Sequence, residues 1–295
     1  MPSPEVLVVG AGPAGLAAGI HLARAGIPHL LLERTRPGGL LHAAGLVECY
    51  PGFPRGIQGP RLARAMQRQA LALGVRIEAA AAVDARIEAG AFALRVGGSW
   101  LRAPCLVLCC GTRPRPVAGL PVEGDLAGRL HASTASLPRR LAGRRVLVSG
   151  GGDAAFDSAL QLRARGAEVG LVLRGPPRAL PVLVERVRRG GLPVLQGWQL
   201  DGVRRCGPRL ELSLRGPAGE ERRAEVDHLL CCHGREPEDG LWRALAPGEV
   251  PQDVPTAREG LFLAGDLLRG RCRYAAVAAG DGLRAARLAE AWLRR

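Results

Sequence analysis

Near its start the chain reads Val8-Val9-Gly10-Ala11-Gly12-Pro13-Ala14-Gly15, a stretch with the spacing G-x-G-x-x-G directly behind an apolar run. This spacing is typical of a strand-to-helix turn that binds the pyrophosphate of a dinucleotide. A second such turn, Val148-Ser149-Gly150-Gly151-Gly152-Asp153-Ala154-Ala155, follows about half a chain later and has the form G-x-G-x-x-A. One match is weak evidence, but two matches predict two dinucleotide sites, as in proteins that move electrons between two cofactors.

The segments around the first turn complete a dinucleotide-binding unit. Residues 5–9 predict a strand, residues 12–25 a helix, and residues 29–33 a second strand that ends at Glu33, 18 residues after Gly15 (33 minus 15). A carboxylate at this place accepts hydrogen bonds from the hydroxyls of an adenosine ribose. Glu33 is therefore a candidate ribose ligand.

Length and hydropathy predict a globular protein. The 295 residues are enough for two domains, since domains commonly have about 100 to 150 residues. The apolar runs are far shorter than the roughly 20 residues of a spanning helix. The first residues lack the basic start and the cleavage site of a secretory signal. We expect a cytoplasmic protein without a membrane segment.

The charge balance predicts an acidic partner. The chain has 41 basic residues, all of them arginine, against 27 acidic residues, which gives a net charge of +14. A positive surface attracts acidic proteins and raises their association rate. Nucleic acid usually requires a basic helix or a basic strip with interleaved aromatic residues, whereas these arginines are scattered along the sequence and aromatic residues make up 3%. We expect no nucleic-acid binding.

Eight cysteines predict neither a disulfide framework nor a metal site. A reducing cytoplasm keeps thiols free. Cys109-Cys110 and Cys231-Cys232 are adjacent pairs at the ends of apolar strands, where neighbours point to opposite faces, so neither pair can enclose one metal ion. We expect buried small residues at these positions.

Further elements extend the first unit. Residues 59–73 predict an amphipathic helix with Pro60 in its first turn, and residues 75–101 predict a strand followed by a meander that turns at Gly90 and Gly97-Gly98. The apolar run 105–112 predicts one continuous buried strand.

The pattern then repeats. Residues 144–173 predict a second βαβ unit, and a meander follows it. Residues 113–120 and 235–239 predict linkers, and the chain closes with a strand near 260–266 and a helix near 274–293. We predict an α/β fold of two Rossmann-like, three-layer domains with parallel central sheets, each with a β-meander, the second inserted into the first. The predicted FAD-binding domain comprises residues 1–114 and 236–295, and the NAD(P)-binding-like domain residues 115–235.

Several motifs, taken in order, resemble the low-molecular-weight thioredoxin reductase family, within class II of the pyridine nucleotide-disulphide oxidoreductases. They are the first glycine turn, Glu33, Gly38-Gly39, Glu48-Cys49-Tyr50-Pro51-Gly52, the apolar strand into Gly111-Thr112, the second glycine turn and Ala264-Gly265-Asp266. The match covers essentially the whole chain. It implies FAD in the first domain, a nicotinamide site in the second, and a homodimer whose two domains rotate relative to each other.

The resemblance also implies a set of FAD contacts. A carboxylate such as Asp266 at the mouth of a strand can accept hydrogen bonds from ribityl hydroxyls, and a helix that begins near Tyr274 can direct its free N–H groups at the flavin. Tyr274 stands where the family carries glutamine. The candidate contacts are Gly10, Gly12, Pro13, Ala14, Gly15, Glu33, Arg34, Gly39, Leu40, Cys49, Gly111, Thr112, Gly265, Asp266, Arg273, Tyr274 and Ala275.

The redox disulfide of the family has no counterpart. In the family a C-x-x-C motif lies shortly before the second glycine turn, and here Ser133-Thr134-Ala135-Ser136 occupies that place. No C-x-x-C exists anywhere in the chain. Serine cannot form a disulfide, so thiolate attack and a mixed-disulfide relay are impossible at this site. We expect no thioredoxin reductase activity of the usual mechanism.

Cys49 leaves two alternatives. It stands where the family carries asparagine near the flavin, and a lone thiol there could attack a substrate disulfide or simply fill the place of the asparagine. Relatives that reduce small disulfides carry a cysteine inside the first glycine motif, where this chain has Ala14, which favours the packing role. The sequence assigns no catalytic residue; His42 is a weak candidate proton donor.

The second turn favours NADPH over NADH. Arg174 lies 19 residues after Ala155 (174 minus 155) in place of the usual carboxylate, which indicates a 2′-phosphate. The family signature has two adjacent arginines and a third a few residues on, whereas this chain has Arg174-Gly175-Pro176-Pro177-Arg178. Asp153 adds negative charge near the pyrophosphate. The candidate NAD(P) contacts are Gly150, Gly152, Asp153, Ala155, Arg174 and Arg178; a vestigial site is the alternative.

Two functional hypotheses follow. The first is an FAD-dependent oxidoreductase that passes electrons between NAD(P)H, FAD and an acidic ferredoxin or flavodoxin, or a small molecule. Ferredoxin-NADP reductases that resemble thioredoxin reductase show the same loss of C-x-x-C. The second is an FAD-binding protein with a vestigial nicotinamide site, reduced by another donor or acting as a redox sensor or partner.

Overall fold

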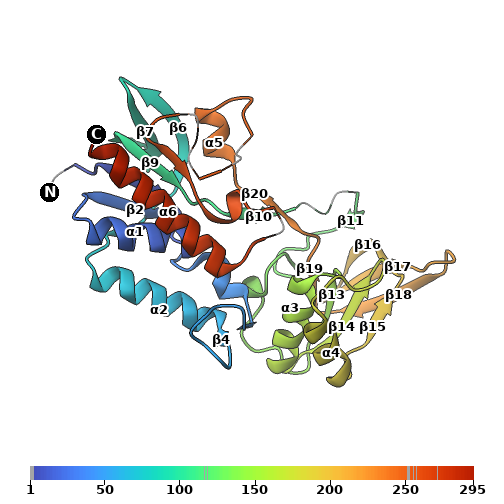
Figure 1. The fold of residues 1–295 in the computed structure, drawn as a ribbon. Coiled ribbons are helices and arrows are strands. Elements are labelled where there is room, and N and C mark those ends of the chain that lie inside the picture. The colour runs from blue at the N-terminus through green and yellow to red at the C-terminus, as the bar shows by residue number, and fades with distance from the viewer. Residues whose placement is uncertain are drawn as a thin grey trace. The chain divides into compact units, whose positions relative to one another are not determined.

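The computed structural model describes residues 3–115, 117, 119–250, 253–254, 256, 258–270 and 272–295. The chain divides into two compact units (Figure 1). The first unit contains Met1–His42, Val47–Arg113 and Glu236–Arg295, and the second contains Ala43–Leu46 and Pro114–Arg235.

A parallel five-stranded sheet forms the centre of the first unit. Its order is β21-β9-β1-β2-β5, with bounds Leu261–Leu263, Cys105–Leu108, Val6–Val9, His29–Glu33 and Ile77–Ala79. The strands β1, β9 and β21 are buried along their whole length, which explains their unbroken apolar sequence. Both faces of this sheet are therefore covered.

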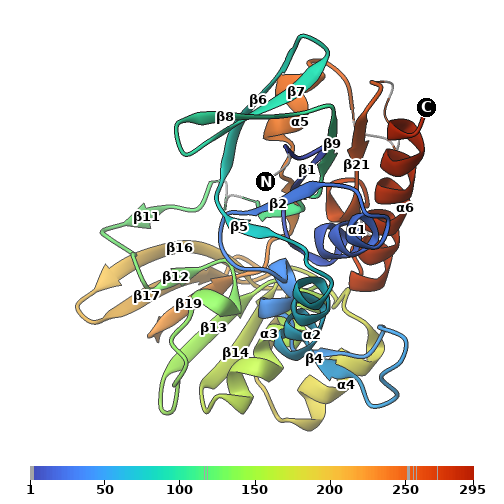
Figure 2. The same cartoon turned by 90° about the vertical axis from the view of Figure 1, so that its left-hand side faces the viewer.

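Helices cover one face of this sheet and a meander covers the other (Figure 2). Val6 and Val8 join the core beneath the helices, whereas Leu7 and Val9 join the core beneath the meander, as strand alternation requires. The helices are α1 (Pro13–Arg24), α2 (Gly59–Ala72) and α6 (Ala275–Leu293). The other layer contains β6 (Ala82–Glu88), β7 (Ala91–Val96), β8 (Ser99–Ala103) and α5 (Gly240–Leu245).

The second unit repeats this plan. Its parallel sheet has the order β12-β19-β13-β14-β15, with bounds Leu130–His131, His228–Cys231, Arg145–Ser149, Glu168–Leu173 and Val194–Gln196. One face packs on α3 (Asp153–Ala164) and α4 (Pro181–Arg189). The other packs on the meander β16 (Gln199–Cys206), β17 (Arg209–Arg215) and β18 (Glu221–Val226), and β11 (Val122–Glu123) pairs with β16. The predicted fold class is confirmed.

Short elements complete the chain. They are β3 (Leu46–Val47), β4 (Ile57–Gln58), β10 (Thr112–Pro114), β20 (Arg235–Pro237) and the 3-10 turns η1 (Gly39–Ala43), η2 (Thr134–Ser136) and η3 (Gly265–Leu267). No helix in the described part of the chain is both long and apolar enough to span a membrane.

One predicted element is wrong in extent. The run 105–112 was expected to be a single strand, but β9 ends at Leu108 and the chain turns through Gly111, whose φ is 69°. The reason lies in the first glycine turn. A Cβ on Gly10 would lie 2.4 Å from the carbonyl oxygen of Cys109, so the backbone after β9 runs directly past this turn.

Candidate functional site

The first glycine turn is closed by backbone contacts. A Cβ on Gly15 would lie 1.8 Å from the carbonyl oxygen of Gly10, and Gly10 itself has a φ of 97°, so both positions require glycine. Gly12 begins α1 without a side-chain cap, and a Cβ on Gly12 would meet no atom within 4 Å. Pro13 follows in the first turn of the helix. The space beside the start of α1 is therefore open, and the free N–H groups of a helix N-terminus suit a phosphate.

Glu33 lies buried beneath this turn, 8% exposed. Its Oε2 accepts a hydrogen bond from the N–H of Ala11 at 2.8 Å, and its Oε1 accepts from the N–H and the hydroxyl of Thr35, both at 2.9 Å. These three bonds fix the carboxylate and leave it about one further acceptor position. The bond to Ala11 was not predicted from the sequence, and it joins the candidate ribose ligand to the turn itself.

Distant segments converge on the start of α1. A Cβ on Gly39 would lie 3.3 Å from the Cα of Gly12, and a Cβ on Gly265 would lie 3.0 Å from the Cβ of Ala14. A Cβ on Gly282, in α6, would lie 2.0 Å from the carbonyl oxygen of Ala14. The structure therefore brings the first turn, Gly39 and Gly265 together, and places half-buried Asp266 directly after Gly265 in η3.

Other predicted contacts lie at the surface of the first unit or beside its strand ends. Tyr274 is the N-cap residue of α6, is 40% exposed and makes no side-chain cap, while Ala275 begins the helix and half-buried Arg273 precedes it. Leu40 is 41% exposed, and Arg34 pairs with Glu238 at 3.5 Å. Thr112 is buried and follows Gly111.

Cys49 is exposed in a hollow of about 420 Å³ lined by residues 48–54. Among the contacts of the described residues, none joins Cys49 to the first turn. The structure therefore brings the glycine motif, Glu33, Gly39 and Gly265 into direct contact.

Asp281 is a functional candidate that the sequence did not reveal. It is 6% exposed within α6, and its Oδ2 accepts hydrogen bonds from Arg269 Nε at 2.7 Å and from the N–H of Gly265 at 3.3 Å. The pair Arg269–Asp281 therefore anchors the turn that carries Asp266. The sequence shows an acid among the small residues of the predicted C-terminal helix, but the partners of Asp281 lie 12 and 16 residues away.

The second turn has the same backbone plan. Gly150 has a φ of 145°, and a Cβ there would lie 2.6 Å from the carbonyl oxygen of Cys232. Gly152 begins α3 without a side-chain cap, a Cβ on it would meet no atom within 4 Å, and Ala155 is fully buried. The space beside the start of α3 is therefore also open.

The loop after β14 is tied to this turn by two bonds. The N–H of Arg178 donates to the carbonyl oxygen of Gly151 at 2.7 Å, and the N–H of Leu180 donates to Asp153 Oδ1 at 2.7 Å. The predicted effect of Asp153 was electrostatic; the structure also gives it this anchoring role. Arg174 and Arg178 are exposed, and neither forms an ion pair with a described residue.

The place of the missing redox disulfide holds a chain of neutral hydrogen bonds. Ser136 donates to the carbonyl oxygen of Ser133 at 2.8 Å, and its Oγ lies 3.0 Å from His131 Nδ1. His131 Nε2 lies 3.1 Å from His228 Nδ1. Burial, and next the proximity of His228, lower the pKa of His131 to about 4. These hydrogen-bonded serine and histidine side chains stay uncharged at neutral pH and, unlike a disulfide, cannot accept electrons.

Five fully or partly buried cysteines are chemically inert. Burial raises the pKa of Cys105, Cys110 and Cys231 to about 12 and that of Cys232 to about 11, and it raises the pKa of Cys109 well above its usual range. These five thiols stay protonated at neutral pH, and a protonated thiol is not a nucleophile. Within the described ranges, no group of three or more His, Cys, Asp or Glu side chains is arranged to hold a metal.

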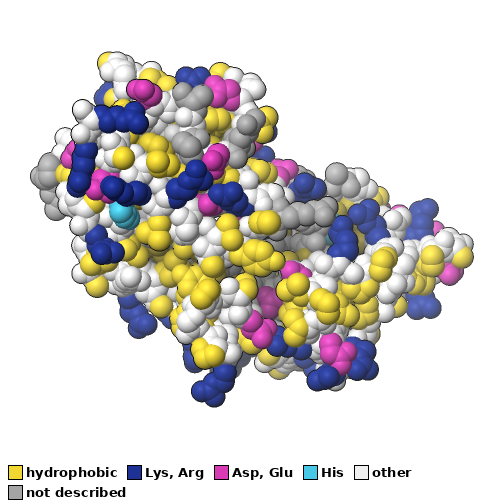
Figure 3. Space-filling view, viewed as in Figure 1, with side chains coloured by type: hydrophobic (Ala, Val, Ile, Leu, Met, Phe, Trp, Pro, Cys, Tyr) yellow, Lys and Arg dark blue, Asp and Glu magenta, His cyan; other side chains and the backbone are white. Residues whose placement is uncertain are grey.

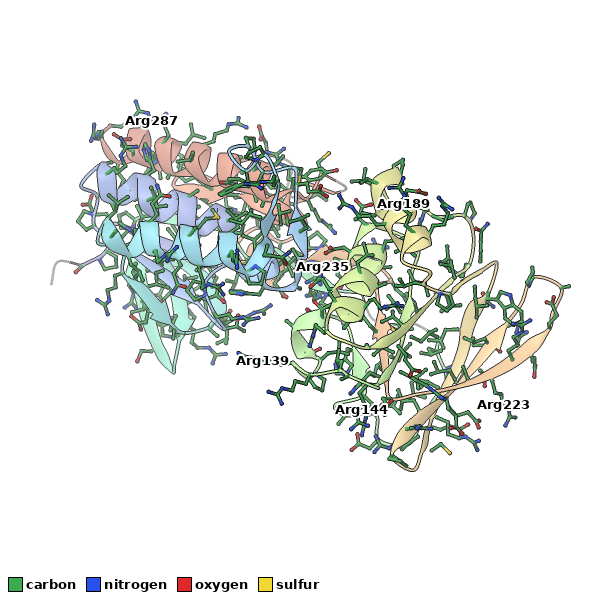
Figure 4. The ribbon with its side chains drawn as sticks, turned by 90° about the horizontal axis from the view of Figure 1, so that it is seen from below. Arg139, Arg144, Arg189, Arg223, Arg235 and Arg287 are labelled. Atoms are coloured by element: carbon green, nitrogen blue, oxygen red, sulfur yellow. The ribbon has the colours of Figure 1, made fainter. Side chains whose placement is uncertain are left out.

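The arginines are less evenly scattered than the sequence suggested. Those labelled in Figure 4 come from different parts of the chain, and Figure 3 shows others dispersed over the face in view. Elsewhere acids neutralise them: Glu185 pairs with Arg188 and Arg189 on α4. The helix α2 differs, because it contains no acid and exposes Arg61, Arg64 and Arg68, which form no ion pair with any described residue. We call these three residues the α2 arginine stripe.

The chain is similar in sequence to proteins of one family over most of its length. The pyridine nucleotide-disulphide oxidoreductase family matches residues 4–282. The bifunctional thioredoxin reductase/thioredoxin of Mycobacterium leprae is 33% identical over 304 residues. The matched region covers 98% of this chain and 66% of that relative, so this chain spans about two thirds of the relative's length. The ferredoxin–NADP reductase of Ignicoccus hospitalis is 31% identical over 288 residues, or 93% of each chain.

The fold has a close counterpart among solved structures. The thioredoxin reductase of Lactococcus lactis superimposes with a TM-score of 0.90 over 99% of each chain, at 22% identity. This likeness concerns the fold alone.

Proposed function

Because the chain belongs to the pyridine nucleotide-disulphide oxidoreductase family, we propose that it is an FAD-dependent oxidoreductase that moves electrons between NAD(P)H, FAD and a further acceptor, without a redox-active disulfide. One observation carries this proposal. The two glycine turns share a backbone plan, but Glu33 binds the first turn whereas Arg174 follows the strand beside the second. A carboxylate suits a ribose and an arginine suits a phosphate, so the two turns suit two different dinucleotides.

The residues of the first unit fit FAD. When bound, FAD accepts a hydride and releases electrons singly or in pairs. We propose residues 1–114 and 236–295 as its domain and residues 115–235 as the nicotinamide domain. The N–H groups at the start of α1 would bind the pyrophosphate, Glu33 would accept from the ribose, and Asp266 would accept from ribityl hydroxyls. The open space over Gly12 supports this assignment.

Electrons would leave by a route other than a thiol pair. Ser133 and Ser136 stand where the family carries its cysteines, so we propose that the protein does not reduce thioredoxin by the usual relay. A relative at 31% identity is named for ferredoxin and NADP, and we propose an acidic electron-transfer protein of the ferredoxin or flavodoxin class as acceptor, with a small molecule as the alternative. We also propose that the protein is a homodimer.

The α2 arginine stripe supports an acidic partner. Arg61 lies in the first turn of α2, where it opposes the helix dipole. Arg64 and Arg68 are spaced i, i+4, and like charges at this spacing cost about 0.2–0.5 kcal/mol per pair. A stripe that costs stability and has no acid within α2 favours a role in binding an external anion.

Reversing charge on the stripe is expected to slow transfer to an acidic acceptor. We expect Arg64→Glu/Arg68→Glu to lower kcat/KM for NADPH-driven reduction of an acidic [2Fe–2S] ferredoxin and of flavodoxin by about tenfold at low ionic strength, and by less at about 200 mM salt. Ferricyanide reduction is expected to stay within about twofold. The matched control is Arg139→Glu/Arg140→Glu, an equal charge change at two exposed arginines outside α2. Equal losses in both double variants would contradict a role for this stripe.

Anaerobic stopped-flow absorbance tests the proposed function. With the FAD-loaded protein, NADPH is expected to bleach the flavin band within about seconds and faster than NADH, because Arg174 favours a phosphorylated nucleotide. The alternative function is an FAD-binding protein with a vestigial nicotinamide site. It is supported by Gly175, which stands where the family signature has its second arginine. Bleaching by neither nucleotide, but by reduced ferredoxin or flavodoxin, would establish that alternative.

A further inference from the structure

His233 lies beside the second glycine turn, at the carboxyl ends of two neighbouring strands. It follows β19 by two residues, and its Nε2 lies 2.7 Å from the Oγ of Ser149, the last residue of β13. Ser149 pairs with Cys231 in the parallel ladder, so His233 reaches the point where the turn begins. The adjoining Cys232 approaches Gly150 closely, as described above. His233 is exposed, and neither the sequence nor the family resemblance assigned it a role.

Arg174 is the charged side chain that acts on His233. Arg174 follows β14, which pairs with the opposite edge of β13, and partial burial together with the charge of Arg174 lowers the pKa of His233. Arg178 lies in the loop that is tied to Gly151, and Arg235 follows His233 by two residues.

The acids of α3 have other partners. Asp153 accepts the N–H of Leu180, and Asp157 accepts hydrogen bonds from the N–H of Gly45 at 2.8 Å and from Gln161 at 3.0 Å. Neither acid contributes to the lowered pKa of His233. The second glycine turn therefore has His233 on one side and Arg174 on the other, and an anion bound between them would stabilise the positive charge of both.

We propose that His233 and Arg174 together bind a phosphate group of the dinucleotide at the second turn, and that binding draws a proton onto His233. This inference rests on the proposed function. In the imidazolium form, Nε2–H donates to Ser149 Oγ and Nδ1–H is available to the phosphate. His233 then supplies a positive group that Gly175 does not.

The direction of the pH effect follows from the charges. Without ligand, Arg174 disfavours a second positive charge on His233. A bound phosphate compensates Arg174 and favours the imidazolium, so the pKa of His233 is higher with ligand than without. Affinity is therefore greatest at low pH and declines as the pH rises through the pKa of the liganded form. A difference of one unit between the pKa of His233 in the liganded protein and that in the free protein corresponds to about a tenfold change in affinity.

Isothermal titration of the FAD-loaded, full-length protein with NADP⁺ and NAD⁺ tests the proposal. Oxidised nucleotides avoid turnover, and two buffers of different ionisation enthalpy report the protons taken up. The phosphomonoester of NADP⁺ itself titrates near pH 6, so the informative quantity is the difference between wild type and His233→Gln, which keeps a donor for Ser149 but does not titrate. His21→Gln, at a half-buried histidine of α1 in the first unit, serves as the matched control.

We expect wild type and His21→Gln to take up protons on binding and His233→Gln to lose this uptake. Between about pH 5.5 and about pH 8.5, wild-type affinity is expected to decline by about tenfold relative to His233→Gln. If the pH profiles of wild type and His233→Gln differ for NADP⁺ alone, His233 binds the 2′-phosphate. If they differ for both nucleotides, His233 binds the pyrophosphate. Binding with identical pH profiles in wild type and His233→Gln overturns the inference but leaves the proposed function intact. Absence of binding by either nucleotide at every pH contradicts both.

Discussion

Gly282→Ala is expected to destabilise the protein by at least about 2 kcal/mol, whereas Gly280→Ala, two residues earlier in the same helix, is expected to stabilise it by up to about 1 kcal/mol. Alanine is about 1 kcal/mol better than glycine in a helix interior, so propensity alone favours both substitutions. A Cβ on Gly282 would lie 2.0 Å from the carbonyl oxygen of Ala14 and 2.7 Å from its carbonyl carbon. Both atoms belong to the backbone of α1 and cannot rotate away. A Cβ on exposed Gly280 would meet no atom within 4 Å.

Urea unfolding of the two variants measures these effects. Gly282→Ala is also expected to bind less FAD, because separating α6 from α1 displaces Ala14 and with it the first glycine turn. Flavin content after purification reports this directly. If the two substitutions changed the unfolding free energy by the same amount, the close packing of α6 on α1 would be disproved.

Arg174→Ala is expected to weaken NADP⁺ binding by about 10- to 100-fold and NAD⁺ binding by less than about threefold. A hydrogen bond to a charged group contributes about 1.5–3 kcal/mol, and the guanidinium of Arg174 has no competing ion pair within the described residues. The converse substitution, Gly175→Arg, is expected to strengthen NADP⁺ binding by about tenfold. Gly175 does not have a positive φ, and a Cβ there would meet no atom within 4 Å, so the added side chain fits.

Titration of both nucleotides into both variants at one pH provides the measurement. Arg163→Ala, which removes an exposed and unpaired arginine from α3, is the matched control for the change in net charge. Selective loss of NADP⁺ affinity in Arg174→Ala alone is the expected pattern. Equal losses for NADP⁺ and NAD⁺ would instead assign Arg174 to the pyrophosphate.

Local patterns predicted the fold because the rules that shape strands, turns and helices act over a few residues. The glycine spacing located both turns, and Gly97-Gly98 located the hairpin between β7 and β8, where both φ angles are positive. The end of β9 at Leu108 could not be predicted, because it depends on a close approach to Gly10, almost 100 residues away.

The supporting contacts of the sites escaped prediction for the same reason. The bonds Glu33–Ala11, Ser149–His233 and His131–His228 join residues 22, 84 and 97 positions apart, and no pattern in the sequence links their ends. The α2 arginine stripe is different. The spacing of its arginines follows the helical period and was available in the sequence. A count of arginines along the chain does not show that three of them lie on one face of a helix.

The two glycine turns have nearly the same backbone, and a backbone of this shape cannot distinguish one adenine dinucleotide from another. The strand after each turn ends differently: β2 ends in the buried carboxylate of Glu33, and β14 is followed by the exposed guanidinium of Arg174. A 2′-phosphate beside Glu33 would meet like charge and would lose its hydration. Under the proposed function, the opposite charges beside the two turns would direct a 2′-phosphate away from the first turn and toward the second.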